Sequence, residues 1–197
     1  MARPREFDTE ALLDQVLSIF LENGWQQTSM RLLESSTGVK QVSLYNAFGN
    51  KEELFLAAFD HWAEQAAEVQ NHYMEGKGLE GIECFVKAIV SKKSPLPMPQ
   101  CGCLAVNTAL VAEVAGPAIQ ERVQEYRDGM HERIHNALAF SKKHGGLRPG
   151  ENLDQCAELI LSAIWGIFVT IRLLSTNSSV GRPAANALVR TIQHWKK

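Results

Sequence analysis

Residues 28–48 read TSMRLLESSTGVKQVSLYNAF, and their pattern predicts the fold of the first part of the chain. Thr28 or Ser29 can cap a short helix, because a hydroxyl accepts a hydrogen bond from the free N–H groups of the first turn. Residues 36–38 include a glycine and turn the chain. A second short helix is expected over residues 40–47. Two short helices joined by a tight turn with glycine are the arrangement of a helix-turn-helix.

The second short helix carries a polar outer face. Apolar side chains recur at the spacing of the inner face, and the outward side chains are Lys40, Gln41, Ser43, Tyr45 and Asn46. Gln and Asn amides pair with adenine through two hydrogen bonds, and Lys reaches guanine or phosphate. The pattern fits a helix that enters the major groove of DNA. It fits equally well a three-helix packing module with a polar surface.

Helical periodicity continues along the whole chain, and no segment shows the sustained alternation of a strand. Further helices are expected over residues 9–23, 51–73, 79–90, 102–113, 117–143, 153–175 and 183–195. The prolines within residues 91–100 exclude a helix there. The expected fold class is therefore all-α, with an N-terminal three-helix helix-turn-helix domain (residues 1–60) and a larger C-terminal helical domain (residues 61–197).

Composition sets limits on the kind of protein. The 197 residues are 45% hydrophobic and 21% charged, which excludes a disordered chain. The net charge of −2 does not point to a nucleic-acid partner, and residues 1–60 hold five Lys/Arg against nine Asp/Glu. Within residues 25–51, however, the local balance is +2, from Arg31, Lys40 and Lys51 against Glu34. DNA binding therefore depends on where the charges lie and not on their sum.

The N-terminus and the cysteines both indicate a cytoplasmic protein. The first residues lead into a polar segment without a secretory apolar core. The longest uncharged apolar run, residues 159–171, is shorter than a membrane span. The four cysteines are too few for a disulfide framework in a chain of this length and are expected as free thiols.

Four ordered segments carry a family resemblance. They read FLENGW (residues 20–25), TSM (28–30), GV (38–39) and LYNAFGNKEELF (44–55). The last is close to the signature Leu-Tyr-x-x-Phe-x-x-Lys-x-x-Leu. From Arg3 to about Phe59 the chain resembles the DNA-binding domain of TetR-family (tetracycline-repressor-like) transcriptional regulators. The rest agrees in outline with the variable effector-binding and dimerisation domain of that family.

The resemblance implies a regulator, expected to be a repressor, that binds a palindromic operator as a homodimer, without catalytic residues, metal or cofactor. The DNA contacts that it implies are Thr28, Ser29, Tyr45 and Lys51 on phosphates, Lys40, Gln41 and Ser43 in the major groove with Asn46 beside them, and Arg3 and Arg5 in a basic arm. Gln41 and Val42 stand where relatives often carry Lys, Arg or Thr, so the operator sequence does not follow from any relative.

Two C-terminal helices are expected to form the dimer interface. Residues 153–174 are apolar nearly all round and must be buried on most faces. Small residues at a spacing of four permit close approach of helices. The expected interface residues are Ser162, Gly166, Thr170, Leu188, Ile192 and Trp195. The alternative is a monomer in which these residues form the core.

The effector site has several candidates. The sequence Cys101-Gly102-Cys103-Leu104 resembles the Gly-Cys-Leu that opens a helix in the branch of the family that includes the N-ethylmaleimide-reductase repressor, and this implies a thiol that senses electrophiles or oxidants. A helix N-terminus lowers a thiol's pKa, as a sensor requires. Alternatively Cys103 only packs in the core, or Met98, Cys101 and Cys103 bind a soft metal. Further pocket candidates are His72, Asn107, Tyr126, Met130, Trp165, Phe168 and Arg172.

Residues 131–135, HERIH, match the HExxH pattern of zinc peptidases, which places two imidazoles on one helix face. Glu151 or Glu158 would be the third ligand. An all-helical chain offers no strand edge for a peptide substrate, so the match is interpreted as a coincidence. A zinc peptidase that uses His131, Glu132 and His135 is nevertheless kept as the first alternative function. The second is a helical ligand-binding protein whose helix-turn-helix no longer binds DNA.

Overall fold

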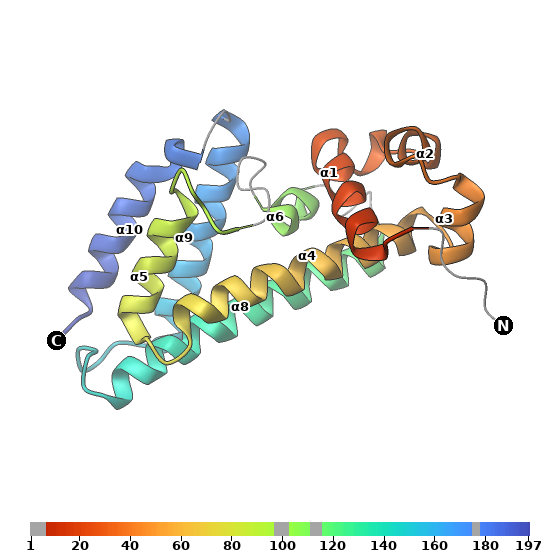
Figure 1. Ribbon diagram of the computed structural model, residues 1–197. Helices are drawn as coiled ribbons and strands as arrows, with labels where there is room; N and C mark the ends of the chain where they lie inside the picture. Colours follow the sequence, from red (N-terminus) through yellow and green to blue (C-terminus); the bar gives the residue numbers. More distant parts are fainter. Residues whose placement is uncertain (1–6, 97–102, 111–115, 175–177) are drawn as a thin grey trace.

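The computed structural model describes residues 7–96, 103–110, 116–174 and 178–197 (Figure 1). Within these ranges every regular element is a helix, and the only β-type pairing is an isolated antiparallel bridge between Leu147 and Lys196. The expected all-α fold class is confirmed.

Three helices form a compact unit at one end of the molecule (Figure 1): α1 (Thr9–Gln27), α2 (Met30–Thr37) and α3 (Gln41–Phe48). The Asp8 side chain caps α1 by accepting hydrogen bonds from two backbone N–H groups of its first turn. Gly24, at φ 75° and ψ 170°, interrupts the helical conformation of α1 where the sequence predicts its end. Gly38, at φ 72°, ends α2 in the left-handed region that favours glycine.

Two long helices run side by side along the molecule, α4 (Lys51–Met74) and α8 (Pro117–Lys143) (Figure 1). A reciprocal capping box starts α4: Asn50 accepts from the Glu53 N–H at 3.0 Å, and the Glu53 carboxylate accepts from the Asn50 N–H at 3.1 Å. The predicted domain boundary after residue 60 lies inside α4. One unbroken helix therefore joins the three-helix unit to the rest of the chain.

The other end contains α5 (Gly78–Ile89), α9 (Leu153–Leu174) and α10 (Arg182–His194), with the 3₁₀ turn η2 (Ser178–Gly181) between the last two. The short α6 (Leu104–Ala109) lies between the two ends and contacts α1, α8 and α9 (Figure 1). The helix expected over residues 102–113 is thus shorter over the described residues. The remaining helices start and end within a few residues of the predicted positions.

Two residues predicted for the dimer interface lie in the core instead. Leu188 and Ile192 of α10 are buried within their own subunit, because α10 packs its apolar face against α5 and α9. They are not available to a partner, and Trp195 is half-buried against the same core. Ser162 and Gly166 are exposed on α9, and Thr170 is half-exposed.

Helix α9 is long and apolar enough to cross a membrane by length and composition, although its uncharged run appeared too short in the sequence. One side of it, including Ile160, Ile164 and Ile171, packs into the core. A core helix passes this test too, so the composition of α9 is weak evidence for a membrane span.

Candidate DNA-binding surface and buried cavity

The α2–turn–α3 unit is held from within by two leucines. Leu33 of α2 and Leu44 of α3 have no exposed surface and pack into the core beneath the turn. Burying a leucine side chain contributes about 1.5–3 kcal/mol, so the two fix the orientation of α3 on α2. Tyr45 and Asn46 are exposed on α3, and Lys40 is exposed at its N-cap.

Gln41, predicted to read bases, already has a partner. Its Nε2 donates to Glu34 Oε2 at 2.8 Å, across the turn from α3 to α2. Ser43 is half-buried beside it. This contact was not predicted from the sequence. Gln41 must exchange the Glu34 carboxylate for a base edge if it is to read DNA.

At the N-terminus of α2, the predicted phosphate contact of Thr28 is wrong. Thr28 has no exposed surface, and its hydroxyl donates to the Gly24 carbonyl at 2.8 Å. Its side chain therefore supports the kink in α1 and does not reach a ligand. Ser29 is exposed and caps α2 by accepting from the Leu32 N–H at 3.1 Å. Arg3 and Arg5, the predicted basic arm, lie outside the described residues.

Lys51 is held at the start of α4 by Trp25. Its ammonium group donates to the Trp25 carbonyl and lies 4.3 Å from the centre of the indole ring. Partial burial lowers the pKa of Lys51. An ammonium has three N–H donors, so the carbonyl leaves others for a phosphate. The contact spans 26 residues in sequence, and no local pattern predicts it.

Four of the predicted effector residues surround one small cavity. Cys103, Tyr126, Met130 and Phe168 line it together with Trp62, Gln70, Phe85 and Leu96. Its volume of about 10 Å³ is roughly the space of one water molecule. Gln70 donates from Nε2 to the Tyr126 hydroxyl at 2.9 Å, and its Oε1 has no hydrogen-bond partner in the described part of the chain.

Gln70 was missed, although the sequence carries a signal for it. Trp62, Ala66, Gln70 and Met74 recur at a spacing of four on α4, and all four are buried. A lone amide on such an apolar stripe marks a polar point inside the core.

Cys103 does not have the properties of a sensor thiol in this conformation. Burial raises its pKa to about 11, although backbone N–H groups of Val106 and Ala105 and the Tyr126 hydroxyl act in the opposite direction. A thiol that stays protonated and is shielded from solvent reacts slowly with electrophiles. The expected lowering of its pKa at a helix N-terminus is wrong, because desolvation outweighs the helix end. Met98 and Cys101 lie outside the described residues.

Trp165 does not line this cavity. It is half-buried on α9, and its indole Nε1–H is buried with no acceptor among the described residues.

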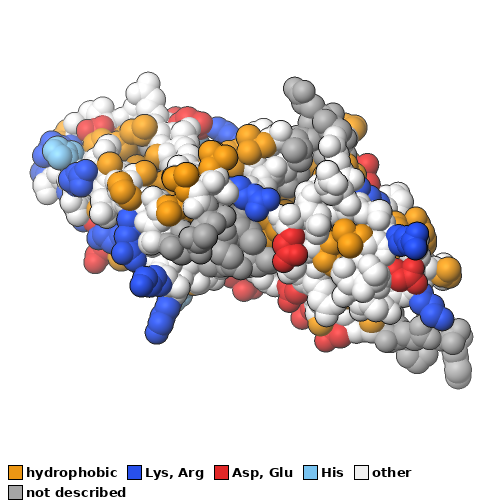
Figure 2. Space-filling model, turned by 90° about the horizontal axis from the view of Figure 1, so that it is seen from above, with side chains coloured by type: hydrophobic (Ala, Val, Ile, Leu, Met, Phe, Trp, Pro, Cys, Tyr) orange, Lys and Arg blue, Asp and Glu red, His pale blue; other side chains and the backbone are white. Residues whose placement is uncertain are grey.

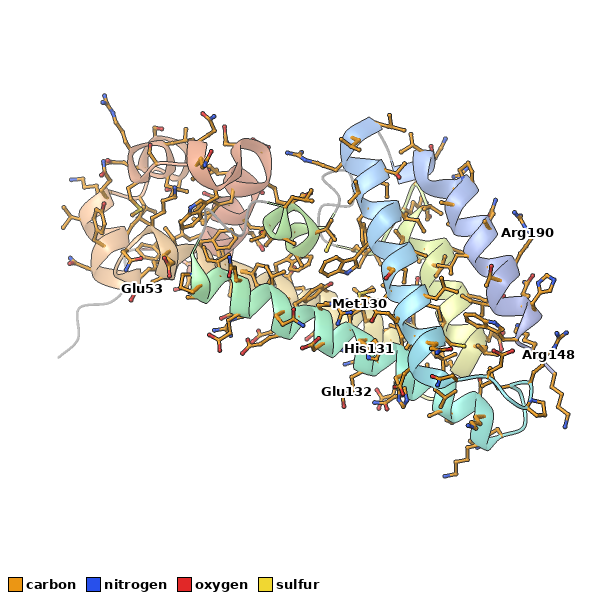
Figure 3. The ribbon with its side chains drawn as sticks, turned by 180° about the vertical axis from the view of Figure 1, so that it is seen from behind. Glu53, Met130, His131, Glu132, Arg148 and Arg190 are labelled. Atoms are coloured by element: carbon orange, nitrogen blue, oxygen red, sulfur yellow. The ribbon has the colours of Figure 1, made fainter. Side chains whose placement is uncertain are left out.

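The HExxH residues face carboxylates and not a metal site. His131 Nε2 lies 3.9 Å from Glu158 Oε2, and His135 Nε2 lies 3.5 Å from Asp154 Oδ1. Figure 3 shows His131 and Glu132 on α8 beside α9. Over the described ranges, no group of three or more His, Cys, Asp or Glu side chains is arranged to hold a metal ion. The geometry therefore gives the peptidase interpretation no support.

The three-helix unit, with α3 exposed and Lys51 held beside it, defines a helix-turn-helix protein with a second helical domain. Residues 12–58 match the family described as "Bacterial regulatory proteins, tetR family". The chain belongs to the TetR family of transcriptional regulators, as the resemblance implied.

Similarity to family members extends over most of the chain. This chain is 27% identical to the HTH-type transcriptional repressor ComR of Escherichia coli K12 over 178 residues, which are 86% of this chain and 82% of ComR. A TetR transcriptional regulator from Chloroflexus aurantiacus is 27% identical and superposes with a TM-score of 0.82 over 95% of this chain and 94% of that one.

A mutant of the TetR-family regulator CifR, solved with 26-base-pair operator DNA, shares the fold. Its TM-score is 0.74 at 21% identity, over 98% of this chain and 100% of that one.

Proposed function

We propose that this TetR-family regulator represses transcription by binding a palindromic operator as a homodimer in the cytoplasm, and that an effector bound by its C-terminal helices releases it. It acts by binding and not by catalysis. The observation that carries the proposal is the exposed face of α3, which is polar except for Val42 and is held by Leu33 and Leu44 beneath it. ComR, a relative along most of its length, is a repressor, and CifR was solved with operator DNA.

The proposed DNA surface consists of Ser29, Lys40, Gln41, Ser43, Tyr45, Asn46 and Lys51. Lys40, Tyr45 and Asn46 are exposed on one helix short enough to fit the major groove. Lys51 and Ser29 flank it at the starts of two other helices, and the N-terminus of a helix favours a bound phosphate. The carboxylates of α1 and α4 account for most of the acidic charge of this domain, and they do not belong to α3.

The proposed dimer interface is the outer face of α9, with the exposed small residues of α10 beside it. Leu159 and Leu173 are 49% and 76% exposed on α9, and the small residues Ser162 and Gly166 lie between them in sequence. A Cβ placed on Gly166 would meet nothing within 4 Å in this subunit. Figure 2 shows hydrophobic side chains gathered over the end of the molecule that carries α9 and α10. A monomeric soluble protein rarely exposes such a patch, and a two-fold pair of subunits would cover it.

The proposed effector site is the cavity around Tyr126, Met130, Phe168 and Cys103. In the present arrangement it holds about one water molecule, so a larger effector requires the surrounding helices to separate. Because such an effector binds only the expanded arrangement, it shifts the population toward that arrangement. Since α4 runs unbroken from the cavity to the three-helix unit, the two recognition helices of the dimer then lose their spacing. Thiol modification is less well supported, since Cys103 is shielded.

Operator binding tests the proposal through two variants of the DNA surface. Footprinting on the DNA upstream of the protein's own gene, at two salt concentrations, should show a protected palindrome whose affinity falls steeply with salt. Lys51→Met and Tyr45→Phe each remove a phosphate contact, so we expect weaker binding and, for Lys51→Met, a salt slope smaller by about one.

Lys143→Met is the matched control, because Lys143 is exposed at the far end of α8. Its affinity should equal that of the wild type. Equal affinity of all four proteins, or no protection on any fragment, would favour a helix-turn-helix retained only as a fold. Stoichiometric zinc in the purified protein, or an altered operator affinity in Glu132→Gln, would instead support a functional role for the HExxH motif.

A further inference from the structure

A second cavity lies at the junction of the three-helix unit and the C-terminal helices. It measures about 210 Å³ and is walled by α1, α4, α6 and α9. Phe20, Trp25 and Phe55 form one wall, with ring centres 4.9–5.9 Å apart. The other wall consists of Leu104, Asn107, Thr108 and Leu110. It has no lining residue in common with the cavity around Tyr126. Its size suits a small organic molecule and greatly exceeds the space of one water molecule.

Among the described residues that line this cavity, one is a cation. Arg172 of α9 donates from Nη2 to the Leu21 carbonyl at 3.2 Å. A guanidinium has five N–H donors, so most of them remain for another acceptor. Over the described ranges Arg172 pairs with no carboxylate, and no Asp or Glu lines the cavity. An apolar aromatic wall with a single arginine therefore favours a flat apolar anion.

We infer that this junction cavity binds a small aromatic carboxylate, with the ring against Phe20, Trp25 and Phe55 and the carboxylate on the Arg172 guanidinium. Arg and carboxylate form paired, charge-assisted hydrogen bonds, whereas the rings offer only apolar contact. A single charge matches a single guanidinium. A neutral ring compound would leave the cationic side of the site unused.

Binding at this site acts on the DNA-binding unit directly. The ligand would contact Trp25, whose carbonyl and ring hold Lys51. It would also bind the guanidinium of Arg172, which connects α9 to α1 through its hydrogen bond to the Leu21 carbonyl. The effect on DNA rests on the proposed function, whereas the binding of the carboxylate does not. If the ligand favours one placement of α1 against α9, DNA and ligand each change the affinity of the other by the same factor.

Calorimetric titration of the full-length protein without DNA tests the site. The probes are 1-naphthoate and its neutral counterpart 1-naphthamide. We expect 1-naphthoate to bind and 1-naphthamide to bind about tenfold more weakly or worse, since a hydrogen bond between two charged groups is stronger than one to a neutral amide. Arg172→Gln should remove the difference between the two probes, and Arg172→Lys should restore part of it. Arg182→Gln is the matched control, because Arg182 is exposed and does not line the cavity.

Thermal unfolding of each variant shows whether it is folded. If Arg172→Gln is folded and still prefers the carboxylate, or if wild-type protein binds neither probe, the inference is wrong. Loss of the preference in Arg182→Gln would overturn it as well. A DNA-binding assay then measures operator affinity with and without 1-naphthoate. Failure to bind any operator would contradict the proposed function and leave the calorimetric result unaffected.

Discussion

Two opposing effects act on the pKa of the Cys103 thiol. The residue stands at the N-cap of α6, where free N–H groups favour a thiolate, but its side chain is buried against Tyr126. A six-residue helix offers few aligned dipoles, whereas burial removes nearly all of the water. Desolvation therefore decides the pKa, and the thiol stays neutral at physiological pH.

Removing Cys103 should change how stability depends on pH. The folded pKa of about 11 lies above the ordinary value of 9.0, so the unfolded chain loses this proton first as pH rises. The stability that this difference provides is complete below pH 9 and is lost between pH 9 and 11. Chemical denaturation at pH 7.5 and 10.5 should show wild type losing about 2 kcal/mol more than Cys103→Ala.

The exposed Cys84 provides the control for the loss of a thiol, through Cys84→Ala. The Tyr126 hydroxyl is present in all three proteins. Parallel pH curves for wild type and Cys103→Ala would mean that the Cys103 thiol is not desolvated in the folded protein.

Helix α5 approaches the backbone of α4 closely at Gly81. A Cβ placed on Gly81 would lie 2.3 Å from the Tyr73 carbonyl oxygen and 3.2 Å from the Met74 Cα. Both are backbone atoms, which cannot rotate away as a side chain can. The tight turn between the two helices therefore depends on the absence of a side chain at this position.

Gly81→Ala should destabilise the protein, because the methyl group forces α5 away from α4. We expect a loss of about 1–3 kcal/mol in the free energy of unfolding, the range typical of overpacking. Gly129→Ala on α8 is the matched control. Its Cβ would meet only the end of the flexible Arg133 side chain at 3.1 Å, so the gain in helix propensity, about 0.5–1 kcal/mol, should dominate. Equal stabilities of the two variants would contradict the close approach of α4 and α5.

The whole molecule is an elongated assembly in which α4 and α8 connect two ends (Figure 1). The helix-turn-helix unit lies at one end, and the exposed apolar face of α9 lies at the other. One helix-turn-helix contacts only half of a palindromic operator, so repression through both half-sites depends on pairing at the α9 end.

Gly166→Glu should separate the subunits. A Cβ at this position meets nothing within 4 Å in its own subunit, so the fold should survive, whereas a charge in an apolar interface is left without water or a partner. Sedimentation velocity should show a dimer for the wild type and a monomer for the variant, with weaker operator binding. Glu132→Lys, at an exposed position of α8, should remain dimeric. A Gly166→Glu protein that is still dimeric would place the interface elsewhere.

The features that depend only on neighbouring residues were predictable from the sequence. The span of α8, the cap at Asp8, the turn at Gly38 and the capping box at Asn50 follow from helix periodicity and local hydrogen bonds, which act within a few residues. The exposed polar face of α3 was predictable for the same reason.

Tertiary packing determines which element covers each apolar face and which distant groups meet, and neither follows from the sequence pattern. Periodicity marks Leu188 and Ile192 as buried but does not say whether the cover is α5 of the same subunit or a partner. The same holds for the desolvated Cys103, for Lys51 against Trp25, and for Arg172 against Leu21, which are 151 residues apart. Burial and long-range contact depend on the summed packing of many helices, and no short pattern in the sequence encodes that sum.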